Sequence, residues 1–179
     1  MLEGLRLCKA LWTGQPVDWD GRWQTTQAVV GPTPHRPGGP PLWIGGNLAG
    51  SLERAGKFFD GWFPIAPSPG EFAAGLAQVR DVARQHQRDP AAMTGAMYLT
   101  LSLNDDAAAA DDQLNAFLER YYEVPAAGTR RRQAHYAGPA AGLPAWLDSY
   151  ARAGASQLVL RFAGDHERHL QIVSKLCIA

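Results

Sequence analysis

The stretch PPLWIGGNLAGSLERAGKFFDGWF, residues Pro40 to Phe63, contains the pattern of a strand, a helix and a second strand. A short apolar run ends in Gly45 and Gly46, a helical pattern follows over about 48–58, and a second apolar run comes after it. A strand that ends in glycines at the start of a helix can bind an anion, because the helix N-terminus presents free N–H groups. The same glycines also suit a tight turn that needs positive φ values. The stretch predicts βα structure and leaves both interpretations of the glycines open.

The alternation of strands and helices continues from this stretch to the end of the chain. Strands are expected over four short, mostly apolar segments: 42–46, 61–65, 96–103 and 157–161. Helices are expected over about 48–58, 69–87, 105–121, 143–153 and 165–177. Such alternation favours one parallel sheet with right-handed crossovers. The spacing fits a doubly wound sheet and part of a barrel equally well.

The first 41 residues carry different signals. Apolar residues at helical spacing predict a helix at the N-terminus, and Asp20-Gly21 between alternating aromatic residues predicts a β-hairpin. Residues 31–41 hold five prolines and three glycines, so an irregular connector is expected there.

Composition limits the classes of function. The 179 residues are 46% apolar and 19% charged, which is typical of a globular domain. Basic and acidic residues number 17 each, and no nucleic-acid partner is expected because phosphate binding needs a basic excess. No apolar run reaches the length of a membrane span, so no membrane association is expected. The two cysteines, Cys8 and Cys177, lack metal-ligand spacing and predict small buried thiols in a reducing, cytoplasmic location.

Four separate motifs resemble the luciferase-like monooxygenase family and follow one another in the order typical of that family. They are EGLRLCKALWTGQPVDWDGRW, PPLWIGG, AGKFFDGWFP and YARAGASQLVLRFAGD. The resemblance implies a flavin- or deazaflavin-dependent oxidoreductase built on a TIM barrel. It also implies that this chain corresponds to the C-terminal half of such a barrel, its four strands matching the fifth to the eighth. A gene fragment, a misplaced start or a truncated product would each give this length.

The expected fold is therefore α/β, half of a (β/α)8 barrel with four parallel strands, outer helices and a small β-hairpin. We expect a single domain over 1–179, in which 1–41 form the helix, hairpin and connector and 42–179 form four βα units. The strand-end residues of the family's N-terminal half have no counterpart in this sequence. The catalytic residues therefore stay unassigned.

Two neighbouring strand ends are the candidate cofactor site. The resemblance implies that the phosphate of FMN or F420 binds at Gly45, Gly46 and Asn47, with Trp62, Phe63 and Pro64 of the next strand end completing the site. Active sites of barrels lie at the C-terminal ends of the strands, where both groups fall. The alternative for Trp62 and Phe63 is an ordinary core role for at least one, because strand neighbours face opposite sides.

Arginines provide the other candidate contacts. Arg161 ends an apolar strand, and it either faces an anionic substrate or forms an ion pair with Asp165 or another acid. The run Arg130, Arg131 and Arg132 is interpreted as a solvated loop face, with the anchoring of an acidic cofactor tail as the alternative.

Histidine spacing gives no metal site. Only His166 and His169 lie at i and i+3, and no cysteine or carboxylate completes a zinc ligand set.

Two functions follow from these patterns. The first is an oxidoreductase that uses reduced FMN or F420 on an unknown small-molecule substrate. The alternative is a non-catalytic half barrel, a fragment or simple binding module. In either case four strands without the rest of a barrel leave inward side chains and strand edges uncovered. A homodimer or higher oligomer is therefore expected.

Overall fold

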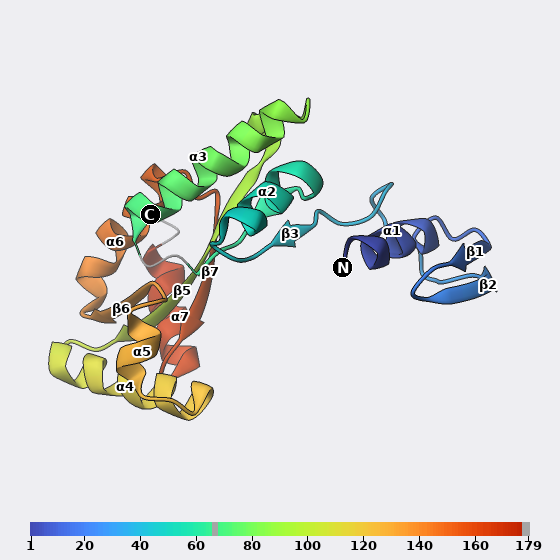
Figure 1. Cartoon of the computed structure of the whole chain (residues 1–179). Helices are drawn as coiled ribbons and strands as arrows, with labels where there is room; N and C mark the ends of the chain where they lie inside the picture. Colours follow the sequence, from blue (N-terminus) through green and yellow to red (C-terminus); the bar gives the residue numbers. More distant parts are fainter. Residues whose placement is uncertain (66–67, 177–179) are drawn as a thin grey trace. The chain divides into compact units, whose positions relative to one another are not determined.

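The computed structural model describes residues 1–65 and 68–176 (Figure 1). They fall into two compact units, Met1–Pro41 and Leu42–Ala179. The boundary lies at the predicted end of the connector, while the organisation of residues 1–179 as one domain stays a prediction. No helix among the described residues combines the length and the apolar character needed to cross a bilayer.

The first unit consists of one helix and a hairpin. It contains α1 (Leu2–Leu11), β1 (Val17–Asp20) and β2 (Gln24–Ala28), and the two strands pair antiparallel. Asp20 pairs with Gln24, which confirms the predicted hairpin. The carboxylate of Glu3 accepts a hydrogen bond from the Arg22 N–H in the hairpin turn at 2.8 Å, and this bond ties the helix to the hairpin.

The prediction of buried cysteines is wrong for Cys8, which is exposed and has a free thiol. Its position on α1 lies one residue past Leu7, the buried residue of that helix. Cys177 lies outside the described residues.

The second unit is built on a parallel sheet. Its strands are β3 (Trp43–Ile44), β4 (Gly61–Trp62), β5 (Thr94–Leu103), β6 (His135–Gly138) and β7 (Gln157–Phe162). β5 pairs with β4 near its start and with β6 near its end. β7 runs along its other edge, since Thr100 pairs with both His135 and Arg161. The four predicted strands and their parallel pairing are confirmed, and β6 is a further short strand that the sequence did not indicate.

Helices connect these strands. They are α2 (Ala49–Phe58), α3 (Pro69–Gln85), α4 (Ala107–Tyr122), α5 (Ala126–Arg130), α6 (Leu143–Arg152) and α7 (His166–Leu176), with 3₁₀ turns η1 (Pro90–Ala92) and η2 (Ala140–Gly142). Ser68 caps α3: its hydroxyl accepts from the Glu71 N–H at 3.2 Å and donates to the Glu71 carboxylate at 2.6 Å. The hydroxyl thus provides the N-cap half of a capping box, and the Glu71 carboxylate binds the hydroxyl itself.

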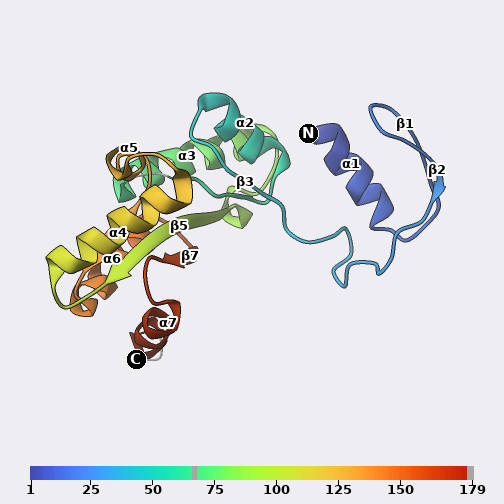
Figure 2. The same ribbon diagram turned by 90° about the horizontal axis from the view of Figure 1, so that it is seen from below.

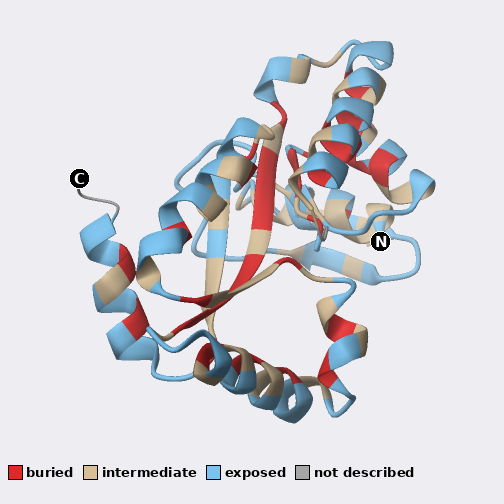
Figure 3. Cartoon of the chain, turned by 90° about the vertical axis from the view of Figure 1, so that its left-hand side faces the viewer, coloured by how far each residue is buried: buried red, intermediate tan, exposed pale blue. Residues whose placement is uncertain are grey.

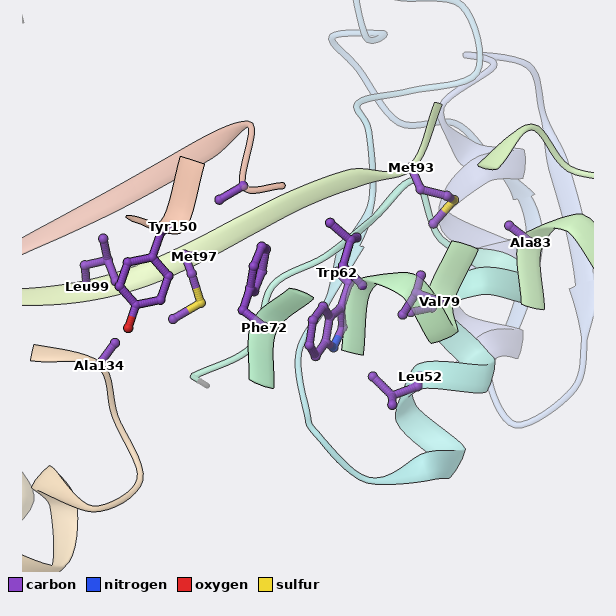
Figure 4. Close-up of a cluster of buried hydrophobic side chains, with 13 residues drawn as sticks. Leu52, Trp62, Phe72, Val79, Ala83, Met93, Met97, Leu99, Ala134 and Tyr150 are labelled. Atoms are coloured by element: carbon purple, nitrogen blue, oxygen red, sulfur yellow. The ribbon is translucent and has the colours of Figure 1, made fainter. Parts of the chain in front are cut away.

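The main core lies between one face of the sheet and helices α2, α3 and α6 (Figure 4). Met97 and Leu99 of β5 are fully buried there. The rings of Trp62 and Phe72 stack with centroids 5.5 Å apart, which joins β4 to α3. The next alternate residues of β5, Leu101 and Leu103, pack against α6 and α7. β5 is accordingly red over most of its length in Figure 3.

The opposite face of the sheet is covered only near the carboxyl ends of its strands. There α4 and α5 pack against Ala137 and Ala163, and α4 runs alongside the carboxyl-terminal part of β5 in the view of Figure 2. Trp43 and Val159, on the strands, and Ile65, three residues after the end of β4, are 37–42% exposed. The uncovered part of this face is thus smaller than the sequence led us to expect, because two helices cover its end.

Candidate functional site

The turn that follows β3 is exposed and needs glycine. Gly46 has φ +101°, and a Cβ atom added there would lie 2.8 Å from the Ser51 hydroxyl oxygen. Any other residue at position 46 would therefore meet both backbone strain and a steric clash. Gly45 and Asn47 flank it and are also exposed, so their backbone is accessible to a ligand.

Helix α2 begins directly after this turn without a side-chain cap. Leu48 occupies the N-cap position, makes no side-chain hydrogen bond and is 80% exposed. The N–H groups of Ser51 and Leu52 donate to the Leu48 carbonyl, and no side chain caps the N–H groups ahead of them. The first turn also contains no acidic residue. A helix start of this kind can accept an anion through its backbone.

The second strand end fixes the shape of the turn. Trp62 is 2% exposed, and its indole Nε1 donates to the Gly46 carbonyl at 2.9 Å. The Phe63 N–H donates to the Ile44 carbonyl at 2.9 Å, while the Phe63 ring lies on the other face, edge-on to Tyr98. Trp62 is therefore a core residue that positions Gly46. Pro64 is buried beside it.

A cavity of about 280 Å³ lies between the start of α2 and α3. Asn47, Trp62 and Glu71 are among its lining residues. Glu71 is the only charged residue among the described ones that line it, so a phosphate would be repelled on this side. An anion at the turn is favoured on the exposed backbone of residues 45–50 instead.

Arg161, at the end of β7, is held by hydrogen bonds from three directions. Its Nη1 donates to the Tyr122 hydroxyl at 3.1 Å, and its Nη2 donates to Thr100 Oγ1 at 3.0 Å and to Gln133 Oε1 at 3.2 Å. Its Nε is buried and has no hydrogen-bond partner among the described residues. The predicted ion pair with Asp165 is not formed, and no described carboxylate lies within ion-pair distance of Arg161.

Aromatic rings surround the Arg161 guanidinium in place of acids. Its Cζ atom lies 4.8–5.3 Å from the ring centroids of Tyr98, Phe117, Tyr121 and Tyr122. Ring faces attract a cation but do not neutralise its charge. Burial raises the pKa of the Tyr98 phenol above its ordinary value, and the charge of Arg161 opposes that rise.

The three arginines of the loop have three different environments. Arg130 binds the Asp111 carboxylate at 2.6 Å and donates to Asn115 Oδ1 at 2.9 Å, and thereby joins α5 to α4. Its hydrogen bond lowers the pKa of the Asp111 carboxyl below the ordinary value. Arg131 and Arg132 are both exposed, and Arg132 also donates from Nε to the Gly128 carbonyl and lines a cavity. The solvated-loop interpretation therefore suits Arg131 and Arg132 but not Arg130.

Histidine 169 has a structural position. It is 1% exposed, its Nε2 accepts from the Leu103 N–H at 2.8 Å, and its Nδ1 is hydrogen-bonded to the Asp165 carbonyl. Since Nε2 accepts from a backbone N–H, the proton of the neutral ring belongs on Nδ1. Among the described residues no group of three or more His, Cys, Asp or Glu side chains is arranged to hold a metal ion.

Sequence reasoning missed Tyr122 and Gln133, which connect Arg161 to the cavity beside Arg132. Neither residue belongs to a motif. The only available signal was the i, i+4 spacing of Phe117 and Tyr121 on α4, which predicts an aromatic stripe on one face of that helix.

The comparison with protein families gives one clear match. The model of the luciferase-like monooxygenase family matches residues 1–176. A curated relative, the phthiodiolone/phenolphthiodiolone dimycocerosates ketoreductase of Mycobacterium sp. (strain JLS), is 31% identical over 131 residues. This match covers 69% of the present chain and 34% of the relative, so the chain spans about a third of the relative's length.

Solved structures share the fold. An F420-dependent secondary alcohol dehydrogenase, in complex with an F420-acetone adduct, matches with a TM-score of 0.80 and 18% identity, over 97% of this chain and 58% of that one. A long-chain alkane monooxygenase has a TM-score of 0.70 and 12% identity, over 96% and 53%. Riboflavin lyase, with modified FMN and riboflavin, has a TM-score of 0.70 and 11% identity, over 98% and 55%. The sheet thus corresponds to part of the TIM barrel of these enzymes.

Proposed function

Because the chain belongs to the luciferase-like monooxygenase family, we propose that it serves an oxidoreductase reaction that uses reduced FMN or F420. The observation that carries this proposal is the exposed turn at Gly45, Gly46 and Asn47, whose backbone leads into an uncapped helix. The names of two structural neighbours, one with F420 and one with FMN, support a cofactor of this type.

The residues of the chain would bind and orient the cofactor. Backbone N–H groups at the start of α2 would hold its phosphate, and Trp62 would keep the Gly46 carbonyl turned away from it. Phe63 and Pro64, at the next strand end, would border the same region. The bound reduced cofactor would supply the electrons of the reaction. The substrate would be a small molecule of unassigned class.

A matched pair of glycine variants tests the phosphate site. Gly46→Ala introduces strain and a clash with Ser51. The matched control is Gly70→Ala on α3, where an added Cβ meets nothing within 4 Å and which lies outside the turn. We expect the parent chain and Gly70→Ala to bind FMN or F420 with equal affinity, and Gly46→Ala to bind at least tenfold more weakly. Flavin fluorescence would measure binding, and circular dichroism would show that both variants fold.

Equal affinities in the two variants, or no binding of either cofactor by the parent chain, would contradict the proposal.

A second candidate function is a non-catalytic half barrel that associates with itself. The observation that favours it is the uncovered sheet face, with Trp43, Ile65 and Val159 each more than a third exposed. Within the described residues β3 pairs only with β4 and β7 only with β5, so each has a free edge. Free edges and exposed apolar side chains promote association. We therefore propose a homodimer that forms through this face.

We also propose a cytoplasmic location. The free thiol of Cys8 supports it, because unpaired cysteines are usual where the surroundings are reducing.

A further inference from the structure

The region around Arg161 contains a cavity whose lining is basic and partly apolar. It has a volume of about 210 Å³ and lies beside the carboxyl end of the sheet. Its described lining residues are Ile65, Tyr122, Val124, Thr129, Arg132 and Gln133. They include no carboxylate. Arg132 is therefore the charged residue of this lining.

The Tyr122 hydroxyl is arranged as a hydrogen-bond donor toward this cavity. Its oxygen accepts from Arg161 Nη1 at 3.1 Å and from Gln133 Nε2 at 2.8 Å. Two donors occupy the acceptor positions of a phenol oxygen, so its own O–H must point elsewhere. Within the described residues no acceptor is hydrogen-bonded to this O–H. Tyr122 itself lines the cavity, which leaves the proton available to a ligand.

The charge of Arg161 reinforces this arrangement. Arg161 is not among the lining residues, but it touches two of them, since it also donates to Gln133 Oε1 at 3.2 Å. Its charge is compensated by no described carboxylate, and it lies behind the Tyr122 hydroxyl. A positive charge near the cavity favours an anion there. Arg161 is thus a positioning residue for the donor side of the cavity.

Arg132 supplies a second cation from the loop. Its Nε is engaged with the Gly128 carbonyl at 3.1 Å, which fixes the start of the guanidinium and leaves its terminal nitrogens for a ligand. The hydroxyl of Tyr122 and the guanidinium of Arg132 both line the cavity, and both are donors suited to carboxylate oxygens. Ile65 and Val124 add apolar walls, which suit a short hydrocarbon body.

From this geometry we propose that the cavity binds a small organic monocarboxylate, with the carboxylate on Tyr122 and Arg132 and the apolar body against Ile65 and Val124. The site is separate from the phosphate turn of Gly46 and does not depend on the proposed redox function. Its volume accommodates a ligand of only a few carbons. Inorganic anions would lack the apolar contacts.

Isothermal titration of the purified chain with hexanoate, and with hexanamide as a neutral ligand of the same shape, tests the proposal. We expect hexanoate to bind and hexanamide to bind at least tenfold more weakly, because a charge-assisted hydrogen bond is lost. Arg132→Gln should weaken hexanoate binding about tenfold, and Tyr122→Phe should also weaken it. Arg131→Gln, an exposed neighbour outside the lining, should bind like the parent chain.

Equal binding of hexanoate and hexanamide would overturn the proposal, as would no binding by the parent or an equal loss in the Arg131 and Arg132 variants. Competition identifies the source of the carboxylate. Displacement of hexanoate by F420 but not by FMN would assign it to an acidic cofactor tail, and no displacement would assign it to a free acid. Both competition results support a carboxylate site.

Discussion

Replacing His169 tests whether one hydrogen bond holds α7 to the sheet. His169→Phe keeps a ring of similar size but removes the acceptor of the Leu103 N–H, which is buried at the end of β5. A buried donor left without an acceptor costs about 1–3 kcal/mol. His169→Ala also leaves a cavity where a 1% exposed ring stood, and truncation of a buried aromatic ring costs about 3–5 kcal/mol. That is a large part of the ~5–15 kcal/mol by which domains are usually stable.

Urea unfolding followed by circular dichroism would measure these losses. Arg168→Ala is the matched control, because Arg168 precedes His169 on α7 and its side chain is exposed. We expect the unfolding free energy to fall in the order Arg168→Ala, His169→Phe, His169→Ala, with the control within about 0.5 kcal/mol of the parent. A His169→Phe variant as stable as the control would refute the reasoning, because it would show that the Leu103 N–H needs no acceptor.

Two further predictions concern acid stability and assembly. The lowered pKa of Asp111 means that its ionised form stabilises the fold above the ordinary carboxyl pKa of about 3.9, and that this stabilisation is lost as the pH falls through the lower, folded-state value. The stability difference between the parent and Asp111→Asn in urea unfolding should therefore be constant from pH 7 to 5 and shrink below pH 4, and a difference independent of pH would count against the Arg130 bond as its cause. For assembly, Val159→Lys should convert a dimer into a monomer in size-exclusion chromatography with light scattering, while Leu170→Lys, on α7 and 59% exposed against 39% for Val159, should leave it dimeric. A monomeric parent chain would contradict association through the sheet face.

Much of the fold was predictable because its signals are local. The capping box of Ser68 and Glu71 marks the start of α3, and the apolar run of β5 marks a strand buried by helices. The helix expected over about 105–121 begins at Ala107, because the Asp106 carboxylate caps it through the Ala108 N–H. Asn104, two residues earlier, is an equally good capping residue, so the sequence alone could not fix the start.

β6 could not be predicted, because its four residues, His135–Gly138, carry no apolar alternation. It exists because β5 extends past β4 and offers free backbone groups from Thr100 to Leu103. Strand pairing of this kind depends on the length of the neighbouring strand, so the propensities of residues 135–138 do not predict it.

For the candidate sites, too, local features were predictable from the sequence and long-range contacts were not. The need for glycine at position 46 was inferred from the strand–helix turn, and the structure gives it a positive φ. The environment of Arg161 was not inferred, because its partners Tyr122 and Gln133 are 39 and 28 residues away along the chain. Contacts of this range come from tertiary packing, and a single sequence gives no measure of them.

The hydrogen bond from Trp62 to Gly46 has a consequence for how this region could evolve. Trp62 fills the core against α3, where Gly75 leaves room for its ring: a Cβ on Gly75 would lie 2.2 Å from the indole. The conformation of the exposed turn at Gly46 therefore depends on Trp62, and the position of Trp62 depends on the absence of a side chain at Gly75 in α3. A drift from Trp62 to phenylalanine would preserve much of the packing, yet it would release the carbonyl that shapes the turn. We expect Gly75, Trp62 and Gly46 to change together or not at all in related sequences. A substitution in the core at Trp62 would therefore also alter the exposed turn at Gly46.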